Sequence, residues 1–116
     1  MYKRQWYGPA VLADPPGDRT KTVEAGDGER IVRHTRCALD ELAQTVAITF
    51  ETERFTGQRR VERVIETHPM RFFFPREIAL ALAGAGLRVG AIVPFGRVTG
   101  RPGARNWNIT VVARHF

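Results

Sequence analysis

The predicted fold follows from the stretch Met70-Arg-Phe-Phe-Phe-Pro-Arg-Glu-Ile78, continued to Gly86-Leu87. Pro75 fixes its own φ near the helical value and has no N–H, so it suits the first position of a helix. Glu77 follows closely enough to interact favourably with the helix dipole. Apolar residues then recur at spacings of four and three: Ile78, Leu82 and Ala85. Gly86 can adopt a positive φ and end the helix, so we predict a strand, a helix over residues 75–86 and another strand.

Segments with alternating apolar and polar side chains precede this helix in residues 29–71. A period of two is typical of a half-buried β-strand, and short polar turns separate the segments. The predicted strands are Glu29–Leu39, Gln44–Phe55 and Arg59–Arg71. Strands joined by short turns pair as antiparallel neighbours, so we predict a β-meander. Four of its glutamates are expected to pair with nearby arginines across the strands: Glu51, Glu53, Glu62 and Glu66.

The other segments complete a single domain over residues 1–116. Residues 1–28 are predicted to be an aromatic N-terminal segment with turns, which include a tight hairpin turn at Asp27-Gly28. Residues 87–116 are predicted to form a terminal β-hairpin with a long glycine- and arginine-containing loop. The predicted fold class is therefore α+β: an antiparallel β-meander plus one main helix packed on a mostly antiparallel sheet.

These segments resemble the C-terminal part of small-molecule class I S-adenosylmethionine-dependent methyltransferases. In that family a lid strand, an R-[YF]-F-[TS]-P-x-E-[LI] helix start and an A-G-F-x-V strand lead into the end of the sheet. The matching pieces here are Arg71-Phe72-Phe73, Pro75, Glu77-Ile78, Ala85-Gly86-Leu87-Arg88-Val89 and the closing strand Asn106–Arg114. Phe74 stands where the family has a Thr or Ser N-cap, so the helix start lacks a side-chain acceptor. The resemblance implies a meander that covers an active site and takes part in subunit contacts.

The sequence lacks the cofactor-binding half that the resemblance would lead one to expect. A class I methyltransferase binds S-adenosylmethionine through an early strand, a glycine-rich turn and an acidic residue that ends the next strand. The nearest glycine-containing stretch is Glu24–Glu29. The residues before its glycines are too polar for the expected strand, and those after them do not resemble the expected helix. We therefore expect the lone chain to bind no cofactor, with S-adenosylmethionine implied only when a partner completes the fold.

This absence predicts association with another chain. If the central strands are missing, one edge of the last strand, Trp107–Arg114, carries unpaired N–H and C=O groups. The flank of the helix would be a second exposed apolar surface. We expect either a homodimer or a complex with a separate chain that supplies the cofactor domain.

Composition narrows the function classes further. The chain carries a net charge of +6, with eighteen basic residues of which only Lys3 and Lys21 are lysine. Because the arginines are spread along the chain, we do not expect a nucleic-acid site. A single cysteine, Cys37, cannot form an internal disulfide, which favours a reducing, cytoplasmic setting. No apolar run is long enough to span a bilayer, and the three histidines share no metal-ligand spacing, so neither membrane nor metal is predicted.

Two groups of candidate binding residues follow. Residues that would line a pocket for a small-molecule substrate or a partner are Trp6, Tyr7, His68, Arg71 and Phe73. Residues whose guanidinium groups suit a phosphate or carboxylate are Arg97, Arg101 and Arg105. No side chains are arranged as a catalytic nucleophile and its base, so no catalytic residue is predicted.

Three functional classes remain open at this stage. The first is a truncated or split methyltransferase that acts on a small molecule with the help of a partner or dimer. The second is a non-catalytic binding or assembly module derived from a methyltransferase. The third is an arginine-rich domain that binds an anion or nucleic acid, for which steeply salt-dependent binding to oligonucleotides would be diagnostic.

Overall fold

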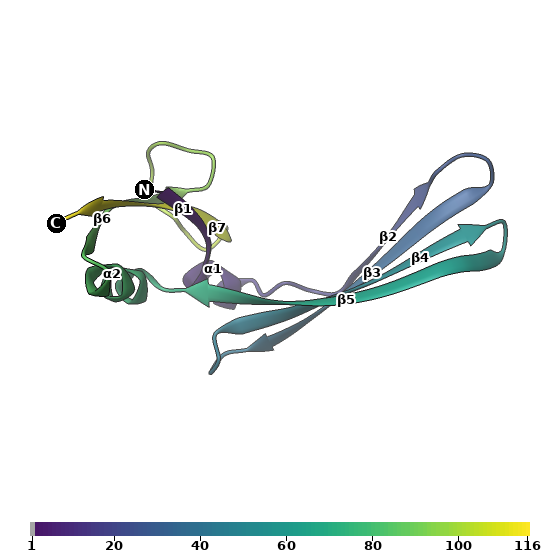
Figure 1. The fold of residues 1–116 in the computed structure, drawn as a ribbon, viewed down its shortest axis with the longest axis horizontal. Coiled ribbons are helices and arrows are strands. Elements are labelled where there is room, and N and C mark those ends of the chain that lie inside the picture. Colours follow the sequence, from purple (N-terminus) through teal and green to yellow (C-terminus); the bar gives the residue numbers. More distant parts are fainter. Residues whose placement is uncertain (1) are drawn as a thin grey trace. The chain divides into compact units, whose positions relative to one another are not determined.

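The computed structural model describes residues 2–116, which form seven strands and two helices (Figure 1). The strands are β1 (Tyr2–Tyr7), β2 (Arg19–Glu24), β3 (Glu29–Asp40), β4 (Thr45–Thr56), β5 (Arg59–Phe73), β6 (Leu87–Pro94) and β7 (Asn108–His115). The helices are α1 (Gly8–Ala13) and α2 (Pro75–Gly84). Hydrogen-bonded neighbours follow the order β2-β3-β4-β5-β1-β7-β6 in a mixed sheet, so the predicted α+β class is confirmed.

The elements divide into two compact units. Residues Pro16–Met70 make the first, which we call the meander unit. The second, which we call the terminal unit, contains the chain up to Pro15 and Arg71–Phe116. Strand β5 contributes most of its length to the meander unit and its last three residues to the terminal unit.

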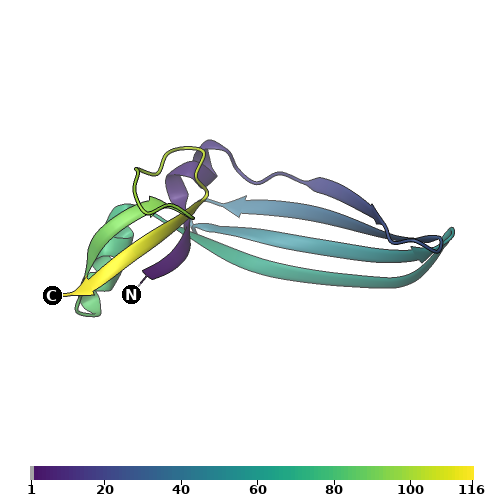
Figure 2. The same cartoon turned by 90° about the horizontal axis from the view of Figure 1, so that it is seen from above.

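The meander unit holds strands β2 to β5, which run side by side in both ribbon views (Figures 1 and 2). Strand β3 pairs in antiparallel fashion with β2 on one side and with β4 on the other. The predicted turn between β2 and β3 is present, with positive φ at Asp27 and Gly28 of 51° and 73°. The alternating pattern thus predicted β3, β4 and β5 to within a few residues at each end.

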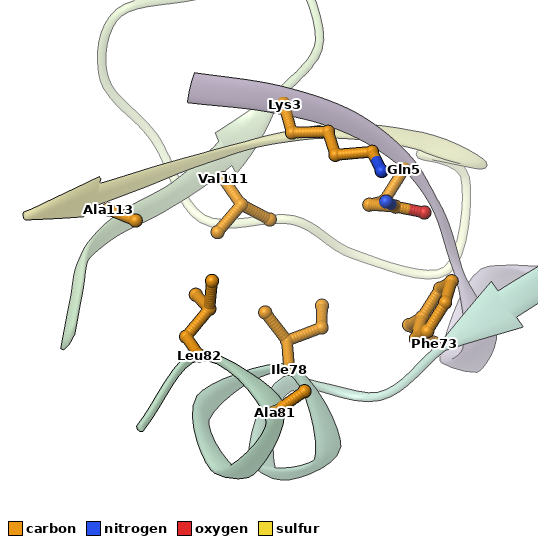
Figure 3. A pocket seen from close by; sticks show the side chains of 8 residues that line it. All are labelled: Lys3, Gln5, Phe73, Ile78, Ala81, Leu82, Val111 and Ala113. Atoms are coloured by element: carbon orange, nitrogen blue, oxygen red, sulfur yellow. The ribbon is translucent and has the colours of Figure 1, made fainter. Parts of the chain in front are cut away.

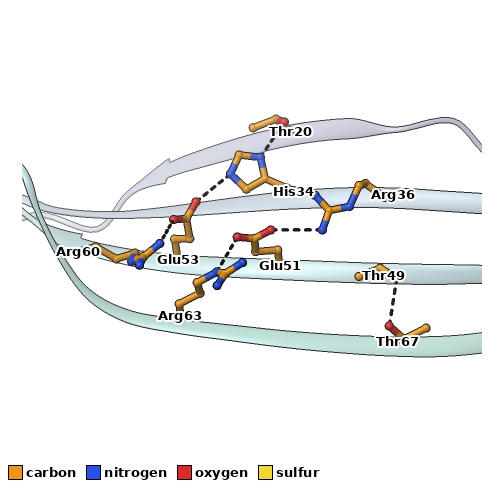
Figure 4. Close-up of polar contacts among 9 residues, drawn as sticks. All are labelled: Thr20, His34, Arg36, Thr49, Glu51, Glu53, Arg60, Arg63 and Thr67. Atoms are coloured by element: carbon orange, nitrogen blue, oxygen red, sulfur yellow. Dashed lines mark hydrogen bonds and ion pairs between the residues drawn. The ribbon is translucent and has the colours of Figure 1, made fainter.

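One face of the meander carries a ladder of charged groups that pair with one another (Figure 4). Glu51 accepts hydrogen bonds from Arg63 at 2.8 Å and Arg36 at 3.3 Å. Glu53 bonds Arg60 at 3.1 Å and the ring of His34 at 2.9 Å. The hydrogen bond from Arg63 is the main reason that the pKa of Glu51 lies below its usual value.

The pKa of Glu53 is lowered in the same way, chiefly by Arg60 and then by His34. The predicted glutamate–arginine pairing is confirmed for three of the four glutamates, because Glu62 also bonds Arg54 at 3.2 Å. Glu66 instead lies 3.3 Å from Nε2 of His68. We call the surface that carries Glu51 and Glu53 the ladder face.

The terminal unit is built around β7, which has a strand on each side. Strand β6 pairs with it in antiparallel fashion, and β1 does the same on the other edge, with Lys3 opposite Val111 and Trp6 opposite Asn108. The prediction that one edge of the last strand is open is therefore wrong. The sequence predicted no strand before residue 20, so the partner that closes this edge was missed.

The open edge lies instead on β1. Its outer side pairs in parallel with the end of β5 only at Trp6 and Tyr7. The Tyr7 N–H donates to the Trp107 carbonyl at 2.7 Å, and in an antiparallel pair every second residue bonds the same neighbour. The main-chain groups of Arg4 therefore point away from β7, and no strand within residues 2–116 pairs with them.

Helix α2 covers one face of this sheet. Ile78 packs with Ile109 and Val111 of β7 in a buried cluster, and Leu82, one turn later, packs against it. Ile78 and Leu82 of the predicted stripe thus face the sheet, whereas the helix ends at Gly84 and Ala85, the third predicted member, is exposed. The helix start is also as predicted: Phe74 provides no side-chain cap. Glu77 instead accepts the Phe74 N–H at 3.3 Å, which is the second half of a capping box.

The junction between β1 and α1 predicts a strict requirement for glycine at position 8. A Cβ on Gly8 would lie 2.7 Å from two ring atoms of Phe74 and 3.0 Å from the Phe73 carbonyl oxygen. We expect Gly8→Ala to lower the free energy of unfolding by roughly 1–3 kcal/mol through overpacking, measured by urea denaturation. The matched control is Gly17→Ala, because nothing lies within 4 Å of the added methyl group there. Equal stability of Gly8→Ala and wild type would contradict this packing.

Candidate functional site

Two parallel strands end side by side in the terminal unit. Strand β1 ends at Tyr7 and β5 at Phe73, and these two residues are register partners. Each strand leads almost directly into a helix that has a proline in its first turn, Pro9 in α1 and Pro75 in α2. The carboxyl ends of parallel strands are where open α/β sheets bind their ligands. This corner is therefore the natural candidate site.

Arg71, Phe73 and Glu77 are brought together at this corner. The Arg71 guanidinium donates from Nη2 to the Glu77 carboxylate at 2.8 Å. It also lies over the Phe73 ring, 4.6 Å from the ring centre. One hydrogen bond and one cation–π contact thus fix the direction of the arginine at the start of α2.

Trp6 and Tyr7 lie on opposite faces of the sheet because successive residues of a strand alternate. Trp6 stands beside Trp107, with 6.1 Å between the ring centres. Tyr7 packs against the cluster under α2. Of the five predicted pocket residues, the structure brings Tyr7, Arg71 and Phe73 to the α2 side of this corner.

The other predicted residues lie elsewhere. His68 belongs to the meander unit, where its ring centre is 5.8 Å from that of Phe50. The three predicted anion-binding arginines are exposed in the loop between β6 and β7 and form no ion pair within residues 2–116: Arg97, Arg101 and Arg105.

A cavity of about 230 Å³ lies between α2 and the sheet (Figure 3). Its apolar lining comes from Phe73, Ile78, Ala81, Leu82, Val111 and Ala113. The side chains of Lys3 and Gln5 on β1 point toward the same space and supply its polar groups. Sequence reasoning missed both, although a strand over Tyr2–Tyr7 would have placed Lys3, Gln5 and Tyr7 on one face.

The cavity has a mostly apolar lining with few polar groups. Lys3 is the one titratable residue in its lining, so any acid–base or nucleophilic group there is the Lys3 amine. Within residues 2–116, no cluster of histidine, cysteine, aspartate or glutamate could hold a metal ion. Neither of the two helices described is long and apolar enough to cross a membrane.

Comparison with solved structures shows which fold this is. An S-adenosylmethionine-dependent methyltransferase from Clostridium acetobutylicum superposes with a TM-score of 0.67 at 13% identity, over 98% of this chain and 43% of its own. The CcbJ methyltransferase from Streptomyces caelestis gives 0.62 at 22% identity, over 99% and 45%. The sugar N-methyltransferase KedS8 from a Streptoalloteichus species gives 0.62 at 19%, over 92% and 39%.

The likeness is one of fold. The chain adopts the fold of part of an S-adenosylmethionine-dependent methyltransferase and spans less than half the length of each of these three proteins. No protein-family model and no curated protein matches the sequence.

The contacts of Glu77 predict its contribution to stability. We expect Glu77→Ala to lower the free energy of unfolding by about 1 kcal/mol, because the Phe74 N–H and the Arg71 guanidinium both lose an acceptor. Glu77→Gln keeps an acceptor oxygen and should recover part of this loss. Arg76→Ala, at the exposed neighbouring position, is the control. Thermal unfolding followed by circular dichroism measures all three, and equal midpoints for Glu77→Ala and Arg76→Ala would contradict the assignment.

Proposed function

We propose that this chain is the C-terminal, substrate-side part of an S-adenosylmethionine-dependent methyltransferase that acts on a small molecule. In this proposal the strands that bind the cofactor come from outside residues 1–116, as part of a partner. The open outer edge of β1 carries the proposal, because it offers unpaired main-chain groups at Arg4 to a further strand. The fold likeness over less than half of each methyltransferase supports it.

The residues of this chain do not fit the cofactor on their own. The glycine that follows β1 is Gly8, and the Phe74 ring fills the space beside it. The methionine or ribose part of the cofactor needs close approach to the backbone at such a turn, which a ring in contact prevents. No step of methyl transfer is therefore assigned to these residues.

What the chain contributes in this proposal is a binding surface for the methyl acceptor. Phe73 and the cavity under α2 would hold an apolar part of it. Arg71, held by Glu77, presents a guanidinium group at the same corner. The methyl group itself would come from S-adenosylmethionine bound by the partner, and transfer would depend on the proximity of the two bound molecules.

One observation favours a second candidate function. The cavity lining offers no acid or base other than Lys3. A lining of this kind suits a non-catalytic binding or assembly module derived from a methyltransferase equally well. Cofactor binding in the completed fold separates the two candidates.

We expect isothermal titration of the lone chain with S-adenosylhomocysteine to give no saturable heat. A fusion that places the part of CcbJ not covered by this chain before β1 should bind the same ligand, since it restores the missing strands. The control is the isolated CcbJ part, and circular dichroism establishes that the fusion is folded. Saturable binding by the lone chain would contradict the need for outside strands. A folded fusion that does not bind would favour the non-catalytic module.

A further inference from the structure

Two hydrogen-bond donors lie at the β1 side of the cavity under α2. Lys3 and Gln5 are two residues apart on this strand, so both side chains project from the same face of the sheet toward the cavity (Figure 3). The ammonium group of a lysine only donates, and the amide of a glutamine both donates and accepts. Unlike the glutamates of the ladder face, which pair with arginines, the exposed Lys3 forms no ion pair with another described residue. The cavity thus joins an apolar body to one unpaired positive charge.

The volume of the cavity fits one aromatic ring. An apolar cavity of about 150 Å³ lined by Leu, Ile and Phe takes up benzene. The cavity here measures about 230 Å³ and has the same kinds of residue in its lining, Phe73, Ile78 and Leu82, so it has room for a ring and a short polar arm. Water inside it finds few polar partners away from β1, so a ring displaces water that is weakly held.

The charges around the cavity favour an anion as the polar arm. No carboxylate of the described residues lines the cavity, so a ligand with an ammonium group would meet Lys3 and no opposite charge. Arg71 lies outside the lining, and its guanidinium is already held by Glu77 and the Phe73 ring. Lys3 is therefore the cation that remains for a ligand. A carboxylate can accept from an ammonium and an amide together, and such charge-assisted hydrogen bonds are stronger than neutral ones.

We propose that this cavity binds an aromatic carboxylate with one ring, the ring under α2 and the carboxylate at Lys3 and Gln5. As an assignment of the methyl acceptor, it rests on the proposed function and makes the acceptor an aromatic acid. As an assignment of binding, it concerns residues of this chain alone, so the lone chain can test it. An apolar segment of a partner protein would fill the same space but would leave the charge of Lys3 unpaired.

Nuclear magnetic resonance titration of the full, isotope-labelled chain tests the proposal with three ligands of similar shape. They are phenylacetate, its neutral amide phenylacetamide, and the cation phenethylamine. A ligand of this size should bind with a Kd on the order of 1 mM. We expect phenylacetate to shift the amide signals of Lys3, Gln5, Ile78 and Leu82. It should bind about threefold to fivefold more tightly than phenylacetamide, because only the acid meets Lys3 with a charge. Phenethylamine should bind more weakly than both.

Two pairs of variants separate the charge from the apolar body. Lys3→Met should bind the acid and the amide equally, because it keeps an extended side chain and loses the charge. Lys21→Met removes the other lysine, which lies on β2, and should keep the preference for the acid. Ala81→Leu should weaken both ligands, because the larger side chain takes up part of the cavity. Ala79→Leu, at an exposed position of α2 outside the lining, is its control.

Several results would overturn the proposal. These are the absence of shifts at the cavity, equal affinity of the wild type for the acid and the amide, and shifts that acetate reproduces without a ring. Shifts confined to exposed arginines elsewhere would also overturn it. The proposed function fails by a different result, since it depends on whether the folded CcbJ fusion binds S-adenosylhomocysteine and not on what the lone chain binds under α2.

Discussion

The need to pair main-chain N–H and C=O groups is the constraint on which the terminal unit depends. Strand β7 meets this need on both edges, because β6 and β1 each run beside it. The contact with β1 joins residues from the two ends of the chain: the Arg4 guanidinium donates to the Asn108 side chain across 104 positions of sequence. With β7 in place, α2 can bury Ile78 against Ile109 and Val111. The same constraint leaves β1 with one outer edge that only Trp6 and Tyr7 share with a neighbour.

Local patterns in the sequence predicted most of this fold. Period-two alternation predicted β3, β4 and β5, the three meander strands that follow the turn at Asp27-Gly28. Pro75 and the spacing of Ile78 and Leu82 predicted α2. Strand β1 was missed because its cavity-facing side chains, Lys3 and Gln5, are polar and break the apolar alternation. Helix α1 has only six residues, too few for a helical period to be visible.

Two expectations about the arrangement of the terminal unit depended on that one missed strand. Without β1, the last strand looked open on one edge, and Trp6 and Tyr7 looked able to line one pocket. Because successive side chains of a strand alternate, Trp6 and Tyr7 of β1 lie on opposite faces of the sheet. Arg71, Phe73 and Glu77 come together because they belong to one short stretch of chain, in which Arg71 and Glu77 are only six positions apart. Contacts between segments far apart in the sequence, such as β1 with β7, could not be predicted from local patterns of residues.

The chain therefore provides surfaces more than reactive groups. The terminal unit offers an apolar cavity and a sheet edge with unpaired main-chain groups. In the proposed account, the edge receives the strands that bind the cofactor, and the cavity receives part of the methyl acceptor. Each surface is incomplete by itself, which agrees with a fold that spans less than half of the methyltransferases it resembles.

Amide hydrogen exchange along β1 tests whether the outer edge of this strand is open in the lone chain. The main-chain groups of Lys3 and Gln5 point the same way as those of Tyr7, whose N–H donates to the Trp107 carbonyl. The main-chain groups of Arg4 point to the open edge, where an amide exchanges faster. We predict that, in the lone chain, the Arg4 amide exchanges much faster than those of Lys3 and Gln5 on either side of it. Protection of Arg4 equal to that of its two neighbours would show that the edge is already covered, and would contradict the claim that this chain awaits further strands.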